Sequence, residues 1–224
     1  MKKTILLLAV LVSGMSLFSQ SQYANLAPGA INNVVALLNK PAMVSAPNAA
    51  PLGRNWFTLV TDIHVFTQDV TVRQVAAALT DFDNQENYFN GKKSKQKLTI
   101  VSKDQNRVVA DYVSIMIVPI INIQLRTPYR AEITTTENTA QRFVVEFRQL
   151  ESDSSSNNNV KNLYVVRYAE EVMIGGRKYT YIRMYVTQDV NASILPGAKA
   201  TLENSSTDVN VEALQLIIAA AKTK

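Results

Sequence analysis

The sequence contains no cysteine, a single histidine and only seven glycines. Without cysteine the chain can form no disulfide, thiol nucleophile or Cys-ligated metal site, so its stability must come from a hydrophobic core. His64 and Asp62 share one face of a predicted strand, but no second histidine or cysteine exists to complete a zinc site. The few glycines leave no Gly-rich phosphate loop, and no nucleophile-elbow motif is present. We therefore predict no cofactor and no metal, and we expect His64 at the surface of an edge strand.

Residues 1–21 have the pattern of an export signal. Lys2 and Lys3 precede an apolar run over residues 4–18, and the small residues Ser19 and Ser21 suit cleavage. A membrane anchor is the alternative, but the run is shorter than the ~20 residues that a spanning helix needs. No later stretch is long and apolar enough to span. The sequence thus predicts cleavage near Ser21 and an exported protein, periplasmic or secreted, with no transmembrane segment in the mature chain.

The mature chain has one dense group of basic residues, formed by Lys92, Lys93, Lys95 and Lys97. Such a group could meet the phosphates of a lipid surface or of nucleic acid. Because no aromatic residues are interleaved for base stacking, we predict no nucleic-acid partner, and an edge strand protected by lysines is the favoured interpretation. A transient contact with a membrane surface stays open.

Residues 22–55 differ from the rest of the chain and are predicted as an N-terminal extension and linker. Apolar residues at helical spacing follow Pro28, which predicts a short helix over residues 28–39. An Ala- and Pro-rich run then has the composition of a linker. Residues 56–224 are predicted as the folded domain.

The domain begins with a strand over residues 56–66, where apolar and polar residues alternate. A helical face from Val72 to Leu79 and a turn over residues 83–89 predict two short helices. From residue 97 the pattern has period two and predicts six more strands, the last two joined by a hairpin turn at Gly175 and Gly176. Short connections make such strands antiparallel neighbours, so the prediction is an α+β fold with a seven-stranded antiparallel sheet.

A terminal helix is predicted over residues 207–222, with Thr207 or Asp208 as its cap. Its apolar side chains, from Val211 to Ala221, cover an arc of roughly 220°, whereas a surface helix needs only about 100°. The breadth of this arc predicts that the helix lies in a concave surface. The sheet must therefore curve around it.

The order of elements resembles the helix-grip superfamily, which includes START lipid-transfer domains, Bet v 1-like pollen proteins and the bacterial polyketide cyclase and coenzyme Q-binding families. Leu79, Asp81, Phe82, Tyr88 and Phe89 carry the resemblance, together with the position of the terminal helix. It spans roughly residues 56–222, and the export signal and the long extension are departures from common cytosolic members. The resemblance implies an apolar cavity between the sheet and the terminal helix.

The predicted ligand-binding residues are those at inward parity along the strands, the two aromatic residues of the motif and the apolar face of the terminal helix. Met adapts to irregular ligands, and Tyr combines an apolar body with a hydroxyl tip. Filling an ordinary core is the alternative for each residue. The set is Phe82, Tyr88, Tyr112, Met116, Leu125, Tyr129, Phe147, Tyr168, Glu170, Met184, Leu214, Ile217 and Ile218.

Three groups of charged residues have more than one interpretation. Glu170 lies at inward parity, so either a bulge turns it outward or it is a polar anchor in the cavity. Arg126, Arg130 and Glu132 share a strand face and are expected to form cross-strand ion pairs on the wet side of the sheet. The acidic residues that begin at Asp81 match the start of a calcium-binding loop. The later positions do not match, since Glu86 stands where the loop needs glycine and Lys92 where it needs glutamate. We therefore expect Asp81 to cap or end a helix.

The sequence predicts an exported, soluble protein that holds or carries a lipid or other apolar small molecule in an internal cavity. An enzyme of the cyclase or hydrolase type is one alternative, and it would need a titratable group inside, for which Glu170 is the candidate. A partner-binding envelope protein, with the extension or the Ser/Asn-rich loop over residues 152–159 as its contact, is the other alternative.

Overall fold

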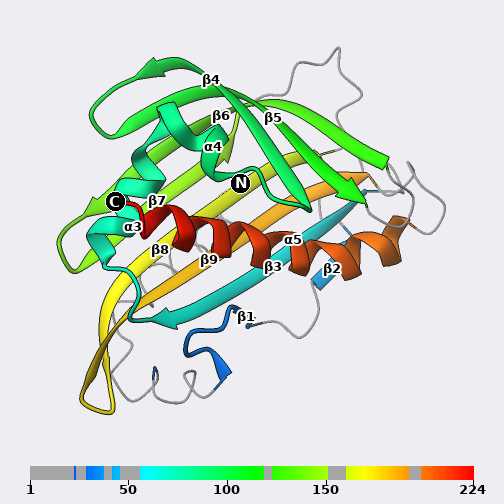
Figure 1. The fold of residues 1–224 in the computed structure, drawn as a ribbon. Helices are drawn as coiled ribbons and strands as arrows, with labels where there is room; N and C mark the ends of the chain where they lie inside the picture. The colour runs from blue at the N-terminus through cyan, green and yellow to red at the C-terminus, as the bar shows by residue number, and fades with distance from the viewer. Residues whose placement is uncertain are drawn as a thin grey trace.

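A long C-terminal helix lies in the curve of one antiparallel sheet (Figure 1). The computed structural model of the protein describes residues 23, 29–37, 42–45, 56–118, 123–150, 160–191 and 198–224. The predicted export signal and the Ser/Asn-rich loop lie outside the described residues. No helix in the described part of the chain combines the length and apolar character needed to cross a membrane.

The described residues form a nine-stranded sheet whose main order is β1-β3-β9-β8-β7-β6-β5-β4, with β2 also paired to β3. All of its pairs are antiparallel, and β4 to β9 form a meander of adjacent hairpins. The strands are β1 (Val35–Ala36), β2 (Ala42–Ser45), β3 (Trp56–Thr67), β4 (Ser94–Lys103), β5 (Arg107–Val118), β6 (Ile123–Asn138), β7 (Arg142–Gln149), β8 (Val160–Ile174) and β9 (Arg177–Asn191).

Two short helices follow β3, as predicted. Thr71 and Gln74 form a capping box at the start of α3 (Val72–Thr80). The side chain of each residue accepts a hydrogen bond from the backbone amide of the other. Asp81 ends α3, also as predicted. The short helix η3 (Phe82–Asn84) and α4 (Gln85–Tyr88) complete this region. One strand, short helices, a six-stranded meander and a terminal helix in the curve of the sheet make up the predicted helix-grip arrangement.

The strand count differs from the prediction of seven. The seven predicted strands are present as β3 to β9, and β1 and β2 are additional. The helix expected over residues 28–39 is wrong in its described part, because Val35–Ala36 is a strand. Likewise Ala42–Ser45, within the predicted linker, pairs with β3. The physical reason is the unpaired edge of β3, whose free amides and carbonyls the extension satisfies.

The terminal helix α5 (Ala198–Ala221) is longer than predicted. Thr207 and Asp208 lie inside it rather than at its cap, because the helix-forming residues from Ala198 onward extend it back toward Pro196 and Gly197. The broad apolar face is confirmed with a qualification. Leu214 and Ile217 are fully buried, whereas the flanking Val211 and Ile218 are only partly buried. Burial of each central side chain contributes about 1.5–3 kcal/mol.

The outer face of the sheet is also apolar over β3, β9 and β8, which the sequence analysis did not predict. Phe66, Tyr168 and Tyr181 form a second core there, and Tyr23 of the extension packs against it, with its ring centroid 5.1 Å from that of Tyr181. His64 lies beside this cluster and is 2% exposed. The expectation of a surface histidine on an edge strand is therefore wrong, since β1 pairs with β3 directly at His64.

The solvent-exposed face of β5 and β6 and the edge strand β4 follow the prediction more closely. Strand β4 is an edge of the sheet, and its residues Lys95 and Lys97 are exposed. Arg130 donates to Asp111 on the neighbouring strand at 2.7 Å and 3.0 Å, which is the expected kind of cross-strand ion pair. Glu132 pairs with Arg107 instead of with Arg130. The side chain of Arg126 lies outside the described residues.

Helix α5 is tied to the start of β4 by one carboxylate. Glu212 accepts hydrogen bonds from the backbone amides of Lys92 and Lys93, at 2.9 Å and 2.8 Å. A Cβ on Gly91 would lie 2.3 Å from a Glu212 carboxylate oxygen, so any larger residue there would displace this carboxylate from its position.

We expect Glu212→Ala to lower the free energy of unfolding by about 1–2 kcal/mol, since two amides lose a charged acceptor. Urea unfolding monitored by circular dichroism measures the change. Gln215→Ala is the matched control, because Gln215 is exposed on the same helix, and it should change stability by no more than about 0.5 kcal/mol. Equal effects of the two variants would contradict the role assigned to Glu212.

His64 should make stability depend on pH. Its pKa is lowered to about 4, chiefly by burial, with the neighbouring Asp62 opposing the shift and Arg183 adding to it. Below its unfolded pKa of about 6.5 the unfolded chain binds the proton and the native state does not, so stability falls as the pH is lowered from 6.5 toward 4, by about 2–3 kcal/mol. Unfolding free energies measured between pH 7 and pH 4 test this. His64→Leu should flatten the slope between pH 5 and 6.5, and an unchanged slope would refute the assignment.

Candidate ligand-binding site

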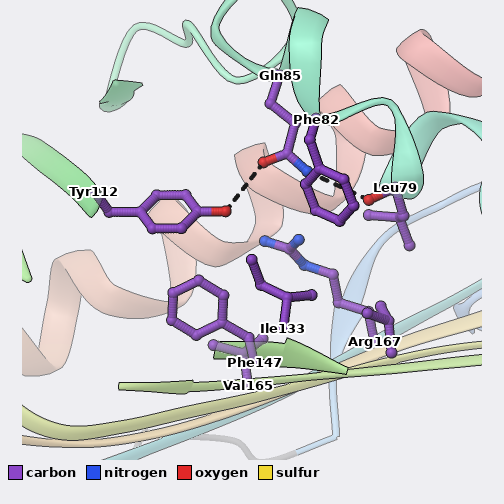
Figure 2. Close-up of a pocket in the computed structure, with 9 residues that line it drawn as sticks. Leu79, Phe82, Gln85, Tyr112, Ile133, Phe147, Val165 and Arg167 are labelled. Carbon is purple, nitrogen blue, oxygen red and sulfur yellow. Dashed lines mark hydrogen bonds between the residues drawn. The ribbon is translucent and has the colours of Figure 1, made fainter. Parts of the chain in front are cut away.

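A small cavity lies between the inner face of the sheet and the short helices. Leu79 of α3, Phe82 of η3 and Gln85 of α4 form its roof, and side chains of β5, β6, β7 and β8 form its floor and walls (Figure 2). The residues that line it are Leu79, Phe82, Gln85, Tyr112, Ile133, Val145, Phe147, Val165 and Arg167. Most are apolar, so the cavity suits an apolar group.

The cavity is nearly closed. The volume open to the centre of a water-sized sphere is about 10 Å³, which is room for about one water molecule. Pockets that hold drug-sized ligands enclose roughly 300–1,000 Å³. The space is therefore too small for a lipid-sized molecule in this structure. The wall predicted to come from α5 is absent from the lining, because Leu214 and Ile217 fill the adjoining core.

Among the described residues, Arg167 is the only charged one that lines the cavity. It lies in the middle of β8, paired with Val145 of β7 on one side and Met184 of β9 on the other. Figure 2 shows its side chain rising from the sheet, with the guanidinium directed toward Gln85 and Tyr112. Its Nε is buried and has no hydrogen-bond partner within the described part of the chain.

An aromatic ring supports this guanidinium in place of a carboxylate. Its Cζ lies 5.3 Å from the centroid of the Phe89 ring, which is a cation–π distance. Burial lowers the pKa of Arg167, and the ionisable groups that act on it electrostatically are Tyr112 and Tyr129. An arginine stays protonated in proteins, so the cavity contains a positive charge without a counter-charge.

The other polar groups of the cavity are neutral. The Gln85 amide donates to the carbonyl of Leu79 at 3.3 Å, and the Tyr112 hydroxyl donates to the Gln85 carbonyl oxygen at 3.4 Å. Tyr112 stacks on Tyr129, with ring centroids 5.6 Å apart. Burial raises the pKa of Tyr129 to about 12 and also raises that of Tyr112. These hydroxyls therefore act as hydrogen-bonding groups near neutral pH.

Three of the predicted ligand residues, Phe82, Tyr112 and Phe147, line the cavity. Most of the others lie in the inner core without reaching it. Tyr129, Met184, Leu214 and Ile217 are buried members of that core, and Tyr88 and Ile218 pack against it partly exposed. The side chains of Met116 and Leu125 lie outside the described residues.

The inward orientation predicted for Tyr168 is wrong, and Glu170 points outward, as one of its two interpretations had it, so it is no polar anchor in this cavity. Both lie on the outer face, where the Glu170 carboxylate accepts hydrogen bonds from the hydroxyls of Tyr23, at 2.7 Å, and Tyr168. The reason is strand register: the turn at Gly175 and Gly176 pairs Ala169 with Ile182, which puts the odd-numbered residues of this part of β8 on the inner face. No bulge is needed to turn Glu170 outward.

The predicted set missed Leu79, Gln85, Ile133, Val145, Val165 and Arg167. The strand residues Ile133 and Val145 follow the inward parity already assigned to their strands. Val165 and Arg167 were missed because both faces of β8 are apolar, so alternation alone does not identify the inner one. The hairpin turn could have found them, since a two-residue turn fixes which residues lie opposite one another.

A polar latch lies beside the roof. Asp81, at the junction of α3 and η3, accepts from the Lys224 ammonium at 2.5 Å and from the Tyr88 hydroxyl at 2.9 Å. Lys224 also donates to Tyr88 at 2.8 Å, so the C-terminal residue holds both ends of the η3–α4 segment. Hydrogen bonds from Lys224, Asn84 and Tyr88 lower the pKa of Asp81 to about 2. The carboxylate thus stays charged at neutral pH.

No family model matches the sequence, and no curated protein matches it either. Solved structures are similar to it at low sequence identity. Human STARD10 is 11% identical, with a TM-score of 0.46 over 81% of this chain and 72% of that one. The Zhui aromatase/cyclase from a Streptomyces species is 14% identical, with a TM-score of 0.49 over 75% and 94%. A STAR-related lipid transfer protein from Xanthomonas axonopodis is 8% identical, with a TM-score of 0.47 over 81% and 98%.

We expect Arg167→Met to raise the free energy of unfolding of the ligand-free protein by about 1 kcal/mol, because it removes a partly buried charge without an ion-pair partner and keeps most of the side-chain volume. Urea unfolding at pH 7 measures the gain. Arg130→Met, which removes an exposed and paired arginine, is the control and should give no gain. A clear loss of stability in Arg167→Met would mean that the guanidinium is already compensated.

Proposed function

We propose that this protein binds a lipid or other apolar small molecule in the cavity beneath α3, η3 and α4. The observation that supports this most is the lining, in which Leu79, Phe82 and Phe147 surround a space that reaches a few polar groups. A concave, mainly apolar site with few convergent polar groups is the usual form of a small-molecule site. The sequence pattern of residues 1–21 supports an exported protein, periplasmic or secreted, as part of the same proposal.

Binding requires the roof to open, and η3 with α4 is the segment best suited to move. These helices are only three and four residues long. Polar contacts hold them: the Asp81 latch, and a hydrogen bond from the Leu98 amide to Glu86 at 2.8 Å. The sheet and α5, in contrast, are joined by continuous backbone pairing and a buried apolar core. Opening at η3 and α4 therefore leaves the sheet pairing and the packing of α5 intact, although it exposes the buried side chains of Phe82 and Gln85.

The alternative of a cyclase or hydrolase lacks support from this site. It depended on Glu170 as a titratable group inside, and Glu170 lies on the outer face. The residues that line the described cavity include no carboxylate and no histidine. Binding is thus the function that the lining favours.

Uptake of the neutral apolar dye N-phenyl-1-naphthylamine tests the proposal. We expect a saturable rise of dye fluorescence at a ratio of about one dye per protein, because a single cavity holds it. Val165→Phe should reduce the affinity at least tenfold, since the added ring fills the cavity from β8. Val101→Phe is the matched control, because Val101 is an exposed residue on β4, and it should bind as the unaltered protein does.

Circular dichroism of each variant separates loss of binding from loss of folding. Absence of dye uptake by the unaltered protein would contradict the proposal. So would equal uptake by a folded Val165→Phe variant, because the dye would then be bound elsewhere.

A further inference from the structure

The guanidinium of Arg167 has hydrogen-bond donors without acceptors, and its side chain is partly buried beside the small cavity. A guanidinium carries five N–H donors, and the described chain satisfies none of them with a hydrogen bond or an ion pair to Arg167. Its Nε is fully buried, and the cavity beside it has room for about one water. Arg167 as a whole is partly buried, and a cation held partly away from water without a partner is stabilised when an anion pairs with it.

Nearby acidic groups are already engaged elsewhere. Asp81 is held by Lys224 and Tyr88, and Glu86 accepts from the backbone of β4. The two ionisable side chains that act on Arg167 are tyrosines, and both are neutral near pH 7 because burial raises the pKa of each. The described chain therefore supplies no negative charge to this site, and an external anion would have no competitor for it.

The surroundings leave the right part of the guanidinium accessible. The Phe89 ring contacts the guanidinium through its π face, with Cζ 5.3 Å from the ring centroid, and it accepts no conventional hydrogen bond from the N–H groups. In-plane donors in a fork match the two oxygens of a carboxylate, which can accept two parallel hydrogen bonds. Tyr112 and Gln85 flank the same space and offer further polar contact.

We propose that the molecule bound in this cavity is an amphiphile with one carboxylate, whose acid group pairs with Arg167 while its hydrocarbon part lies among Phe82, Phe147 and Leu79. The inference rests on the proposed function and adds to it the chemical class of the ligand. A single negative charge is specified because Arg167 is the one cation in the lining. A phosphate head, with a charge of about −1.5 to −2, would be left partly uncompensated in apolar surroundings.

Displacement of the bound dye N-phenyl-1-naphthylamine by three oleoyl compounds tests the inference. Oleate has one carboxylate, oleyl alcohol has the same chain without charge, and oleoyl lysophosphatidate has a phosphate head. We expect oleate to displace the dye from the unaltered protein at a concentration at least tenfold lower than either of the others. Each compound is used below its micelle concentration, so that partition of the dye into micelles does not imitate displacement.

Variants of Arg167 test whether its guanidinium causes the preference for oleate. In Arg167→Met, oleate should lose its advantage over oleyl alcohol, while affinity for the neutral dye is kept. Arg167→Lys, which keeps the charge but not the fork, should retain only part of the preference. Arg130→Met removes an exposed cation from the outer face and should behave as the unaltered protein does, which controls for the change in net charge.

The possible outcomes separate the two proposals. Dye binding with equal displacement by oleate and oleyl alcohol, or an oleate preference that survives Arg167→Met, overturns the inference and leaves the proposed function standing. Tighter binding of lysophosphatidate than of oleate overturns the choice of a carboxylate. Failure of the unaltered protein to bind any of the four molecules contradicts the proposed function, and the inference fails with it.

Discussion

The inner face of a curved sheet must be covered along its whole length, and this requirement determines the rest of the structure. Helix α5 covers most of it, with Leu214 and Ile217 completely buried. It leaves the region above β5 to β8 to the short helices α3, η3 and α4, which cannot fill it as densely (Figure 1). The cavity lies where coverage passes from one long helix to several short ones. Its place in the fold is therefore a consequence of how the sheet is covered.

The one favourable contact of Arg167 in that cavity, among the described residues, is the cation–π contact with Phe89. A methionine or leucine at the same position would fill the space beside Phe89 and Val165 without an uncompensated charge. Groups that destabilise a fold and are retained are often part of a binding or catalytic site, where the cost is offset when the ligand is bound. The roof above Arg167 is held by the buried side chains of Phe82 and Gln85 and by surface polar contacts around Asp81 and Lys224. The polar contacts can break and form again more easily than the apolar packing. A cation without an ion-pair partner beneath a roof of short helices suits the binding of an anionic group.

The architecture was predictable from the sequence to a greater extent than the site. Strand alternation, the Gly175-Gly176 turn and the broad apolar face of the terminal helix are local signals, and they predicted β3 to β9 and the position of α5. The contributions of Val35–Ala36 and Ala42–Ser45 were not predictable, because short strands form only where a partner edge is free. The same holds for His64, whose burial depends on that distant segment. Tyr112 and Phe147 were found because their strands have one apolar face, and Phe82 was found because it belongs to the motif that carries the family resemblance. Arg167 was missed because β8 is buried on both faces, so that only its register with β9 identifies the inner one.

The account depends on the claim that an acid group enters the apolar cavity and meets the guanidinium there. Carbon-13 NMR of oleate labelled at its carboxyl carbon observes that group directly in the complex. A bound resonance that stays at the position of the ionised form well below the usual carboxylate pKa, and that loses this behaviour in Arg167→Met, is the predicted result. A bound carboxyl that titrates as it does in water, in both proteins alike, would show that the acid lies outside the cavity and would contradict the account.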